Sequence, residues 1–324
     1  MKKKSIHDIL PLELIHRIFL RVPAKHLARL SNNNDALQVR KVSPSFTLES
    51  PPHFEVLGSC RGFVLLHQPE RFLVVWNPLT GSSKLISYSH IASGFKHKYG
   101  FGYDASQDDY LAVVPWQDKH GQDHFDCFSL RANSWIDFKD ALPKPLGFNN
   151  WHSPGLFFNG AIHWVPSILN DYRDAILIFD LKERTFSMIS VPEKLGRSSC
   201  IYSGLALLGG CLALYYRNID SYKTEIWVMK EYKVHSSWTL YQISPTYDFR
   251  PLYLSIAMDL IGKRHTYDKS EFYIYNLREE RLQRFKYLCF PGAFFEADAV
   301  YTESLLPLPS GIKDKDEKEE EKGM

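Results

Sequence analysis

Cysteine is scarce in this chain and occurs in an odd number. The 324 residues include five cysteines, at positions 60, 127, 200, 211 and 289, and no two of them form a Cys-x-x-Cys pair. A disulfide framework and a zinc knuckle both depend on such pairing, so the sequence argues against each. We therefore expect a reducing compartment, which places the protein in the cytoplasm, the nucleus or both.

Long hydrophobic runs and an excess of charge are also missing. The longest apolar stretch, from Gly204 to Tyr216, is too short to span a bilayer. Lys2 to Lys4 precede Asp8, Glu13 and Arg17 instead of an uninterrupted apolar core, so no secretory signal is predicted. Lysine plus arginine number 39 against 37 for aspartate plus glutamate, which gives no electrostatic reason to expect nucleic acid or a membrane as partner.

Aromatic residues, in contrast, are abundant, at 14% of the chain, and they recur periodically. Five segments each read as a strand ending in an aromatic residue, a polar turn and a second strand. These aromatic residues, which we call the anchors, are separated by 48 to 52 residues: Trp76, Phe128, Phe179, Trp227 and Tyr275. A period near 50 with hairpins inside each unit is typical of a β-propeller in the range of kelch blades.

Short apolar runs upstream of the anchors complete each unit. Runs beginning near residues 62, 110, 160 and 210 suit strands that are covered on both faces, as in stacked blades. The sequence thus predicts a mainly β fold, a β-propeller of six blades over residues 54–306, with residues 300–305 as a closing strand. A β-sandwich with coincidental spacing is the alternative.

The N-terminal segment has helical periodicity instead. Pro11 suits a first helical position, and five residues recur at the spacing of one helical face: Leu14, Ile15, Ile18, Phe19 and Val22. Pro23 ends this helix, and a second short one is predicted over residues 24–30. Helices this short are marginal in water, so the pair must dock on the propeller or on another protein.

This segment resembles the first half of an F-box. Eleven residues follow that pattern: Leu10, Pro11, Glu13, Leu14, Ile15, Ile18, Phe19, Pro23, Lys25, Leu27 and Arg29. Downstream, the motifs GSCRGFVLL, VVWNPLTGSSKLI, YGFGYDASQDDYLAVV, GAIHWV and VYTESLLPL resemble, in this order, the F-box-associated propeller domain of plant F-box proteins.

The resemblance implies a function and a domain organisation. It implies the substrate-recognition subunit of an SCF-type cullin–RING E3 ubiquitin ligase, which binds an adaptor, and through it a cullin, while its propeller binds a target protein. The expected domains are a partial F-box at 5–30, a linker at 31–53, the propeller at 54–306 and a disordered charged tail at 307–324. The expected adaptor-binding residues are Leu10, Pro11, Leu14, Ile15, Ile18, Phe19, Val22, Pro23 and Leu27.

One departure from the family pattern bears on adaptor binding. An F-box continues into a third helix with a Trp-containing signature, but here SNNNDALQ follows Leu30, and no Trp precedes Trp76. The F-box is therefore read as truncated, together with the first strands of the propeller. An interaction scaffold or decoy that has lost adaptor binding is the alternative function.

Catalytic and metal-binding patterns are weak. His120, His124, Asp126 and Cys127 lie within eight residues, but Gly121 and its polar neighbours indicate a loop between strands and not a helical metal site. The segment Tyr103–Tyr110 resembles a calcium loop without its glycine and glutamate, so a strand-connecting turn is predicted. Cys60 has no recognisable histidine partner. No enzyme activity, metal or cofactor is therefore expected, and a propeller hydrolase or lectin is the remaining alternative.

Overall fold

The computed structural model describes most of the chain from Glu55 to Pro309. The described residues are 55–68, 72–87, 99–117, 120, 123–136, 154–165, 175–192, 200–218, 220–243, 249–255, 258–265, 270–285, 300–301 and 304–309. The predicted helices over 11–22 and 24–30, the linker and nearly all of the charged tail lie outside these ranges. Among the described residues there are strands, turns and one short 3₁₀ helix, η2 (His235–Ser237), but no α-helix.

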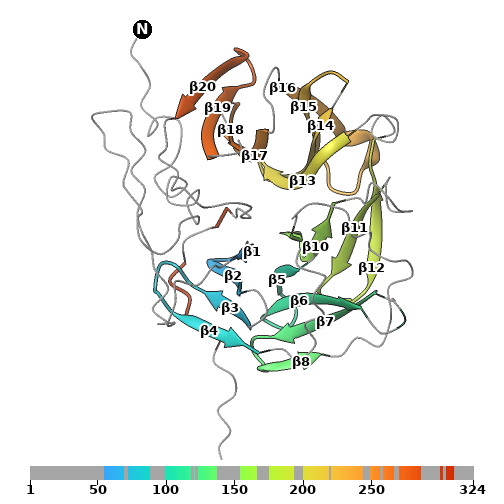
Figure 1. The fold of residues 1–324 in the computed structure, drawn as a ribbon. Helices are drawn as coiled ribbons and strands as arrows, with labels where there is room; N and C mark the ends of the chain where they lie inside the picture. The colour runs from blue at the N-terminus through green and yellow to red at the C-terminus, as the bar shows by residue number, and fades with distance from the viewer. Residues whose placement is uncertain are drawn as a thin grey trace, which may run out of the picture.

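Five antiparallel sheets of four strands each succeed one another along the chain. In every sheet the strands are hydrogen-bonded in sequence order. Figure 1 shows the sheets arranged as an arc of blades, with the first strand of each near the middle and the fourth at the periphery. The strands are β1 (Glu55–Cys60), β2 (Phe63–Gln68), β3 (Phe72–Trp76) and β4 (Ser83–Ile86); β5 (Gly100–Asp104), β6 (Asp109–Gln117), β7 (Asp123–Ser129) and β8 (Ser134–Ile136); β9 (Leu156–Phe158), β10 (Ala161–Trp164), β11 (Ala175–Asp180) and β12 (Phe186–Ser190); β13 (Cys200–Leu208), β14 (Cys211–Asn218), β15 (Lys223–Met229) and β16 (Trp238–Ile243); and β17 (Phe249–Leu254), β18 (Asp259–His265), β19 (Ser270–Asn276) and β20 (Arg281–Phe285).

Tight turns join the first two strands of several sheets. Asn159 and Gly160 connect β9 to β10 with φ of 47° and 74°, and Gly209 and Gly210 connect β13 to β14 with φ of 59° and 77°. Two successive residues with positive φ form the type I′ turn, whose twist matches that of the flanking strands. Asparagine and glycine adopt this conformation with little strain, so these dipeptides fix the register of their hairpins.

The turns between the third and fourth strands reveal the structural repeat. In three sheets the residue after the anchor position donates its backbone N–H across the turn: Asn77 to Ser82 O (2.8 Å), Asp180 to Thr185 O (3.0 Å) and Lys230 to Ser237 O (3.2 Å). Lys230 therefore corresponds to Asn77 and Asp180, and Met229 occupies the anchor position of the fourth sheet. The predicted anchor Trp227 is buried, but it lies two residues earlier on the same face of β15.

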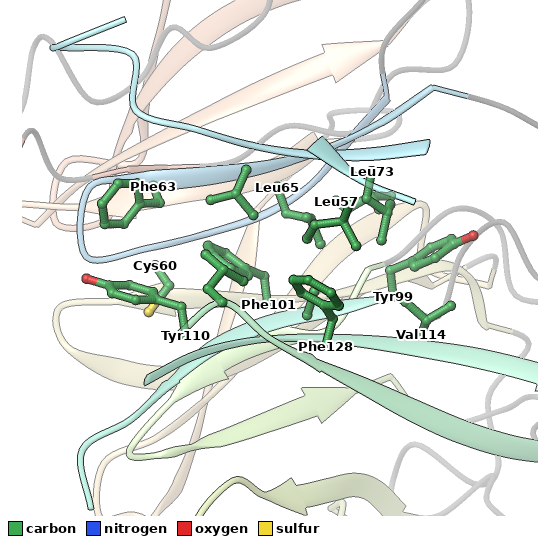
Figure 2. Packing of buried hydrophobic residues seen from close by; sticks show 14 residues of the cluster. Leu57, Cys60, Phe63, Leu65, Leu73, Tyr99, Phe101, Tyr110, Val114 and Phe128 are labelled. Carbon is green, nitrogen blue, oxygen red and sulfur yellow. The ribbon is translucent and has the colours of Figure 1, made fainter. Parts of the chain in front are cut away.

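The core consists of separate apolar layers between successive sheets. Between the first and second sheets, Phe63 and Leu65 point toward Phe101, Tyr110 and Phe128 (Figure 2). The rings of Phe63 and Tyr110 meet edge to face, with centroids 4.9 Å apart. Similar layers lie between the second and third, the third and fourth, and the fourth and fifth sheets. Each sheet is thus stabilised by its neighbours, as expected for stacked blades.

Close packing also explains one glycine inside a strand. The ring of Phe249 on β17 lies so near Gly262 on β18 that an added Cβ would be 2.1 Å from Cζ. Gly262 has an extended backbone, so its requirement is for space and not for a positive φ. Its missing side chain leaves room for the aromatic ring on the adjacent strand.

The mainly β propeller predicted from the sequence is confirmed. The apolar runs near residues 62, 110, 160 and 210 form β2, β6, β10 and β14, the second strand of four sheets. Five sheets lie within the described residues, and a sixth blade stays a prediction. The closing strand expected at 300–305 was wrong in form, because Val300, Tyr301, Ser304 and Leu305 are not in a strand, although they do contact the first sheet.

Candidate interaction site

The expected adaptor-binding residues cannot be placed. All nine, from Leu10 to Leu27, lie outside the described residues, so the structure neither groups nor separates them. The described part of the chain offers instead one end of the propeller, where the turns between first and second strands and between third and fourth strands lie. We call this end the turn face. Most residues of the loops at the other end lie outside the described ranges.

Polar contacts link neighbouring sheets at the turn face. The guanidinium carbon of Arg61, in the first sheet, lies 3.9 Å from the ring centroid of Tyr103 in the second. Asp104 of the second sheet accepts a hydrogen bond of 3.0 Å from Arg184 of the third. Asp104 is 1% exposed as a side chain and Arg184 is 24% exposed, so this ion pair is largely withdrawn from solvent. Each contact fixes one sheet against the next.

The third and fourth sheets are joined by a buried histidine. His163 on β10 is fully buried, with Nδ1 3.2 Å from the carbonyl oxygen of Leu156 and Nε2 2.8 Å from the hydroxyl of Tyr232. A carbonyl only accepts hydrogen bonds, so Nδ1 carries the proton and Nε2 accepts from the tyrosine. Burial lowers the pKa of His163 to about 4 and raises the pKa of Tyr232 to about 12. Both groups are therefore neutral at pH 7.

A buried carboxylate lies near the far end of the fourth sheet. Glu225, at the start of β15, accepts hydrogen bonds from Tyr216 Oη, from Asn218 Nδ2 at 3.0 Å and from Gln242 Nε2 at 3.2 Å. All three donors are neutral, and Glu225 is 7% exposed. Three hydrogen bonds compensate much of the cost of burying the carboxylate. The cluster ties β14, β15 and β16 together.

The last described segment, Val300–Pro309 without residues 302 and 303, lies against the first sheet; we call it the strap. The side-chain nitrogen of Asn77, Nδ2, donates hydrogen bonds to two strap carbonyls, Ser304 O at 2.9 Å and Leu306 O at 3.1 Å. Ser59 Oγ donates to Val300 O at 2.6 Å. Tyr301 is buried in an apolar cluster of the first sheet. The sequence predicted that residues 300–305 would contact the propeller, but it did not identify Asn77 as their partner. The position of Asn77 directly after the anchor Trp76 was the signal that could have indicated it.

The segments weighed for chemistry take structural roles. His124 and Asp126 share one face of β7 while Cys127 is buried on the other, and His120 is exposed in the preceding turn. These four residues therefore do not converge on one point. No group of three or more His, Cys, Asp or Glu with metal-binding geometry occurs within the described ranges.

The predicted strand-connecting turn at Tyr103–Tyr110 is confirmed. Asp104 Oδ1 accepts from the backbone N–H and the hydroxyl of Ser106, and Asp109 accepts from Ser129 Oγ and from the Arg131 N–H. Both carboxylates are thus used to hold turns.

Cys60 is not poised as a nucleophile. Its thiol is buried, and burial raises its pKa well above the usual range, with the charge of Arg61 opposing the shift only in part. A thiol attacks as the thiolate, which burial disfavours here. None of the described residues forms a helix with the length and hydrophobicity that crossing a bilayer requires.

Comparison with solved structures gives weak likenesses. The structure matches TolB from Acinetobacter baumannii with a TM-score of 0.49 and 11% identity, covering 79% of this chain and 59% of that one. It matches a subtype N10 neuraminidase-like protein of A/little yellow-shouldered bat/Guatemala/060/2010 with a TM-score of 0.43 and 11% identity, covering 71% of this chain and 78% of that one. The propeller assignment rests on the five sheets themselves.

Comparison of the sequence gives a family. An F-box/kelch-repeat protein of Arabidopsis thaliana is 29% identical over 212 residues, which cover 63% of this chain and 57% of that protein. The F-box protein CPR1 of the same plant is 27% identical over 299 residues, covering 71% of each chain. The chain thus spans little more than half of the first relative. The family model of the F-box associated beta propeller domain matches residues 19–283, most of the chain, and the protein therefore belongs to the F-box-associated β-propeller family.

Proposed function

We propose that this chain is the substrate-recognition subunit of an SCF-type cullin–RING E3 ubiquitin ligase. Residues 5–30 would dock on the adaptor, and through it on a cullin, while the propeller would hold a target protein. The single observation that carries this proposal is the family match over residues 19–283. A segment that fits the first half of an F-box, Leu10 to Arg29, overlaps the beginning of this match. The curated relatives are themselves F-box proteins.

The mechanism proposed is binding without chemistry by this subunit. A receptor that holds a target beside a loaded ubiquitin-conjugating enzyme raises the effective concentration of the target's lysines. The described polar groups support a scaffold: Asp104, Asp109 and Glu225 are all engaged in hydrogen bonds that hold turns or strands. A target protein would bind to loops carried by this scaffold, since loops are where binding residues concentrate.

The free thiols support a reducing location. Cys60, Cys127 and Cys211 are all unpaired among the described residues, as expected for a cytoplasmic or nuclear protein. We propose that the partners of this chain are proteins and not nucleic acid or membranes, because its net charge is only +2.

A second candidate function follows from residues 31–38. The sequence SNNNDALQ stands where an F-box continues into its third helix. A chain that lacks this part of the docking surface would act as an interaction scaffold or decoy, binding the target but not the ligase.

Co-purification with the adaptor distinguishes the two functions. The full chain is compared with a Leu14→Asp, Ile18→Asp variant, in which two carboxylates replace apolar side chains of the predicted helical face. The control is a His16→Asp, Arg17→Asp variant, whose changes lie outside that face. Substrate-receptor function predicts that the wild-type chain and the control bind while the first variant does not.

If the wild-type chain does not bind the adaptor, but a chain with a third F-box helix inserted after Leu30 does, the decoy function is supported. Equal binding by all three chains would contradict the proposed docking face.

A further inference from the structure

The first sheet has an apolar face that no other described sheet covers. Its side toward β5–β8 packs against the second sheet, but Val64, Leu66, Val74 and Trp76 point to the opposite side. These residues are nevertheless 0 to 5% exposed. Tyr301 of the strap is part of the same cluster and is itself 6% exposed. A residue from the far end of the chain therefore helps to fill the position that a neighbouring blade would take.

The polar contacts of the strap are made by side chains of the sheet to the backbone of the strap. Asn77 is fully buried, and its amide group donates to the carbonyls of Ser304 and Leu306. Its oxygen accepts the N–H of Leu79, so its orientation is fixed by its own turn. Ser59 adds a third bond, to the carbonyl of Val300. Within the strap the N–H of Leu306 bonds to Ser304 Oγ at 3.2 Å, so the backbone bends here. Donors at fixed positions select a backbone whose carbonyls match their spacing.

The first sheet differs from other sheets in the turn that follows its third strand, β3. In three other sheets the residue two after the anchor donates its backbone N–H to the start of the second strand or to the turn just before it: Leu130 to Tyr110 O, Leu181 to Gly160 O and Leu277 to Met258 O. The corresponding residue here is Pro78, which has no N–H. The first sheet therefore lacks this backbone hydrogen bond, and the neighbouring Asn77 side chain bonds to the strap instead.

Shape confines the strap as well. Gly62 has a φ of 93°, and an added Cβ would lie 2.1 Å from Cβ of Ser304, so the strap lies directly on the β1–β2 turn. Leu308 packs against the core between the first and second sheets. Leu305, between these contacts, is 81% exposed. Tyr301 is thus buried and Leu308 partly buried while Leu305 is exposed, so one side of the strap packs on the protein and the other meets solvent.

We propose that the outward face of β1–β4, together with Ser59, Gly62 and Asn77, is a binding site, which we call the groove, for a peptide of the sequence found at residues 300–309. The chain's own strap occupies the groove and can be exchanged for the same peptide supplied separately. The described strap residues form no β-ladder with the sheet, so exchange requires no strand to be pulled from a sheet. The groove lies on the propeller and is independent of adaptor docking by residues 5–30.

The test uses the full chain and a fluorescein-labelled peptide of residues 299–310, with binding followed by fluorescence anisotropy. In the wild-type chain the tethered strap competes at a high effective concentration and excludes the peptide. A Tyr301→Ala chain loses the buried ring of its own strap but retains the groove. We expect it to bind the peptide at least ten-fold more tightly than the wild-type chain.

Two controls assign binding to the groove. Adding Asn77→Ala to the Tyr301→Ala chain should weaken peptide binding at least ten-fold, because the two backbone contacts are lost. A peptide with Leu305→Ala should bind as well as the parent, since that side chain is exposed, whereas a peptide with Tyr301→Ala should not bind.

A second strap variant guards against misfolding. If near-ultraviolet circular dichroism shows that Tyr301→Ala is unfolded, Ser304→Val replaces it, because a branched side chain does not fit against Gly62. Equal peptide binding by the wild-type chain and a folded strap variant would overturn the proposal, as would binding that persists in the Asn77→Ala background. Neither result bears on adaptor binding, which is measured separately.

Discussion

At the scale of single residues, His163 combines complete burial, which disfavours its protonated form, with a hydrogen bond at each ring nitrogen. The carbonyl of Leu156 accepts from Nδ1, and the hydroxyl of Tyr232 donates to Nε2. Burial is the main cause of its lowered pKa, and the nearby charge of Lys233 acts in the same direction. An ionisable group whose pKa differs between the folded and unfolded states makes stability depend on pH.

The sign follows from the two pKa values. The folded pKa is about 4 and the reference value is 6.5, so below pH 6.5 the unfolded chain binds a proton that the folded chain does not. The stabilisation by neutral His163 is complete above pH 6.5 and is lost as pH falls toward 4. Between pH 7 and pH 4, urea unfolding should show the wild-type chain losing up to about 3 kcal/mol more than His163→Gln.

A matched variant isolates the imidazole. Tyr232→Phe removes the hydroxyl partner but leaves the titrating ring, so its stability should still depend on pH in the wild-type manner. A His163→Gln chain that loses as much stability as the wild type over this range would contradict the assignment.

At the scale of strands and turns, two ion pairs near the turn face show why distance alone does not rank contacts. Lys182 and Glu183 are only 2.8 Å apart, but both side chains are more than half exposed. Arg184 and Asp104 are 3.0 Å apart, with the carboxylate buried. An exposed pair is screened by water, whereas removing one partner of a buried pair leaves an uncompensated charge.

We predict that Arg184→Met lowers the free energy of unfolding by about 2–3 kcal/mol, because the Asp104 carboxylate loses its cation and the third sheet loses its link to the second. Lys182→Met should leave the free energy of unfolding nearly unchanged, because the pair it breaks is exposed to solvent. Urea titration of both variants provides the comparison. Similar losses in the two variants would show that burial of Asp104 does not matter.

Strands were easier to predict from the sequence than their equivalence between sheets. Apolar runs bounded by turn residues located β2, β6, β10 and β14, since burial on both faces leaves a local signature. The anchor of the fourth sheet was misplaced because Trp227 is the more conspicuous aromatic residue. Only the backbone bond from Lys230 to Ser237 O identifies Met229 as its counterpart. The size of a side chain is known from the sequence, but the register of two paired strands depends on the geometry of the turn between them.

At the scale of the whole molecule, the buried thiols report on global unfolding. Burial raises the pKa of both Cys60 and Cys127, whose side chains belong to two different core layers. Cys211 lies at a turn and is partly exposed. Iodoacetamide should therefore alkylate Cys211 in the native protein and reach Cys60 and Cys127 only in denaturant, as peptide mapping by mass spectrometry would show. Native labelling of Cys127 at the rate of Cys211 would contradict the packed interface.

The propeller could be predicted as a whole, but its contacts between sheets could not. The period near 50 and the hairpin pattern are local properties, whereas Asp104 and Arg184 are 80 positions apart and nothing in their neighbourhoods signals the pair. Residues 300–305 were expected to close the ring by backbone pairing. The side chain of Asn77 bonds to the strap instead of a paired backbone. A side-chain bond of this kind produces no periodic pattern in the sequence from which it could be predicted.

The strap also sets an order of events during synthesis. Ser59 and Val300, which it brings into contact, are 241 positions apart. A ribosome adds about 5–20 residues per second, so a nascent first blade waits roughly 12–48 s before its cover has been translated. Through that interval the cluster around Trp76 lacks the ring of Tyr301, and a chain that stops short of Tyr301 would lack it permanently.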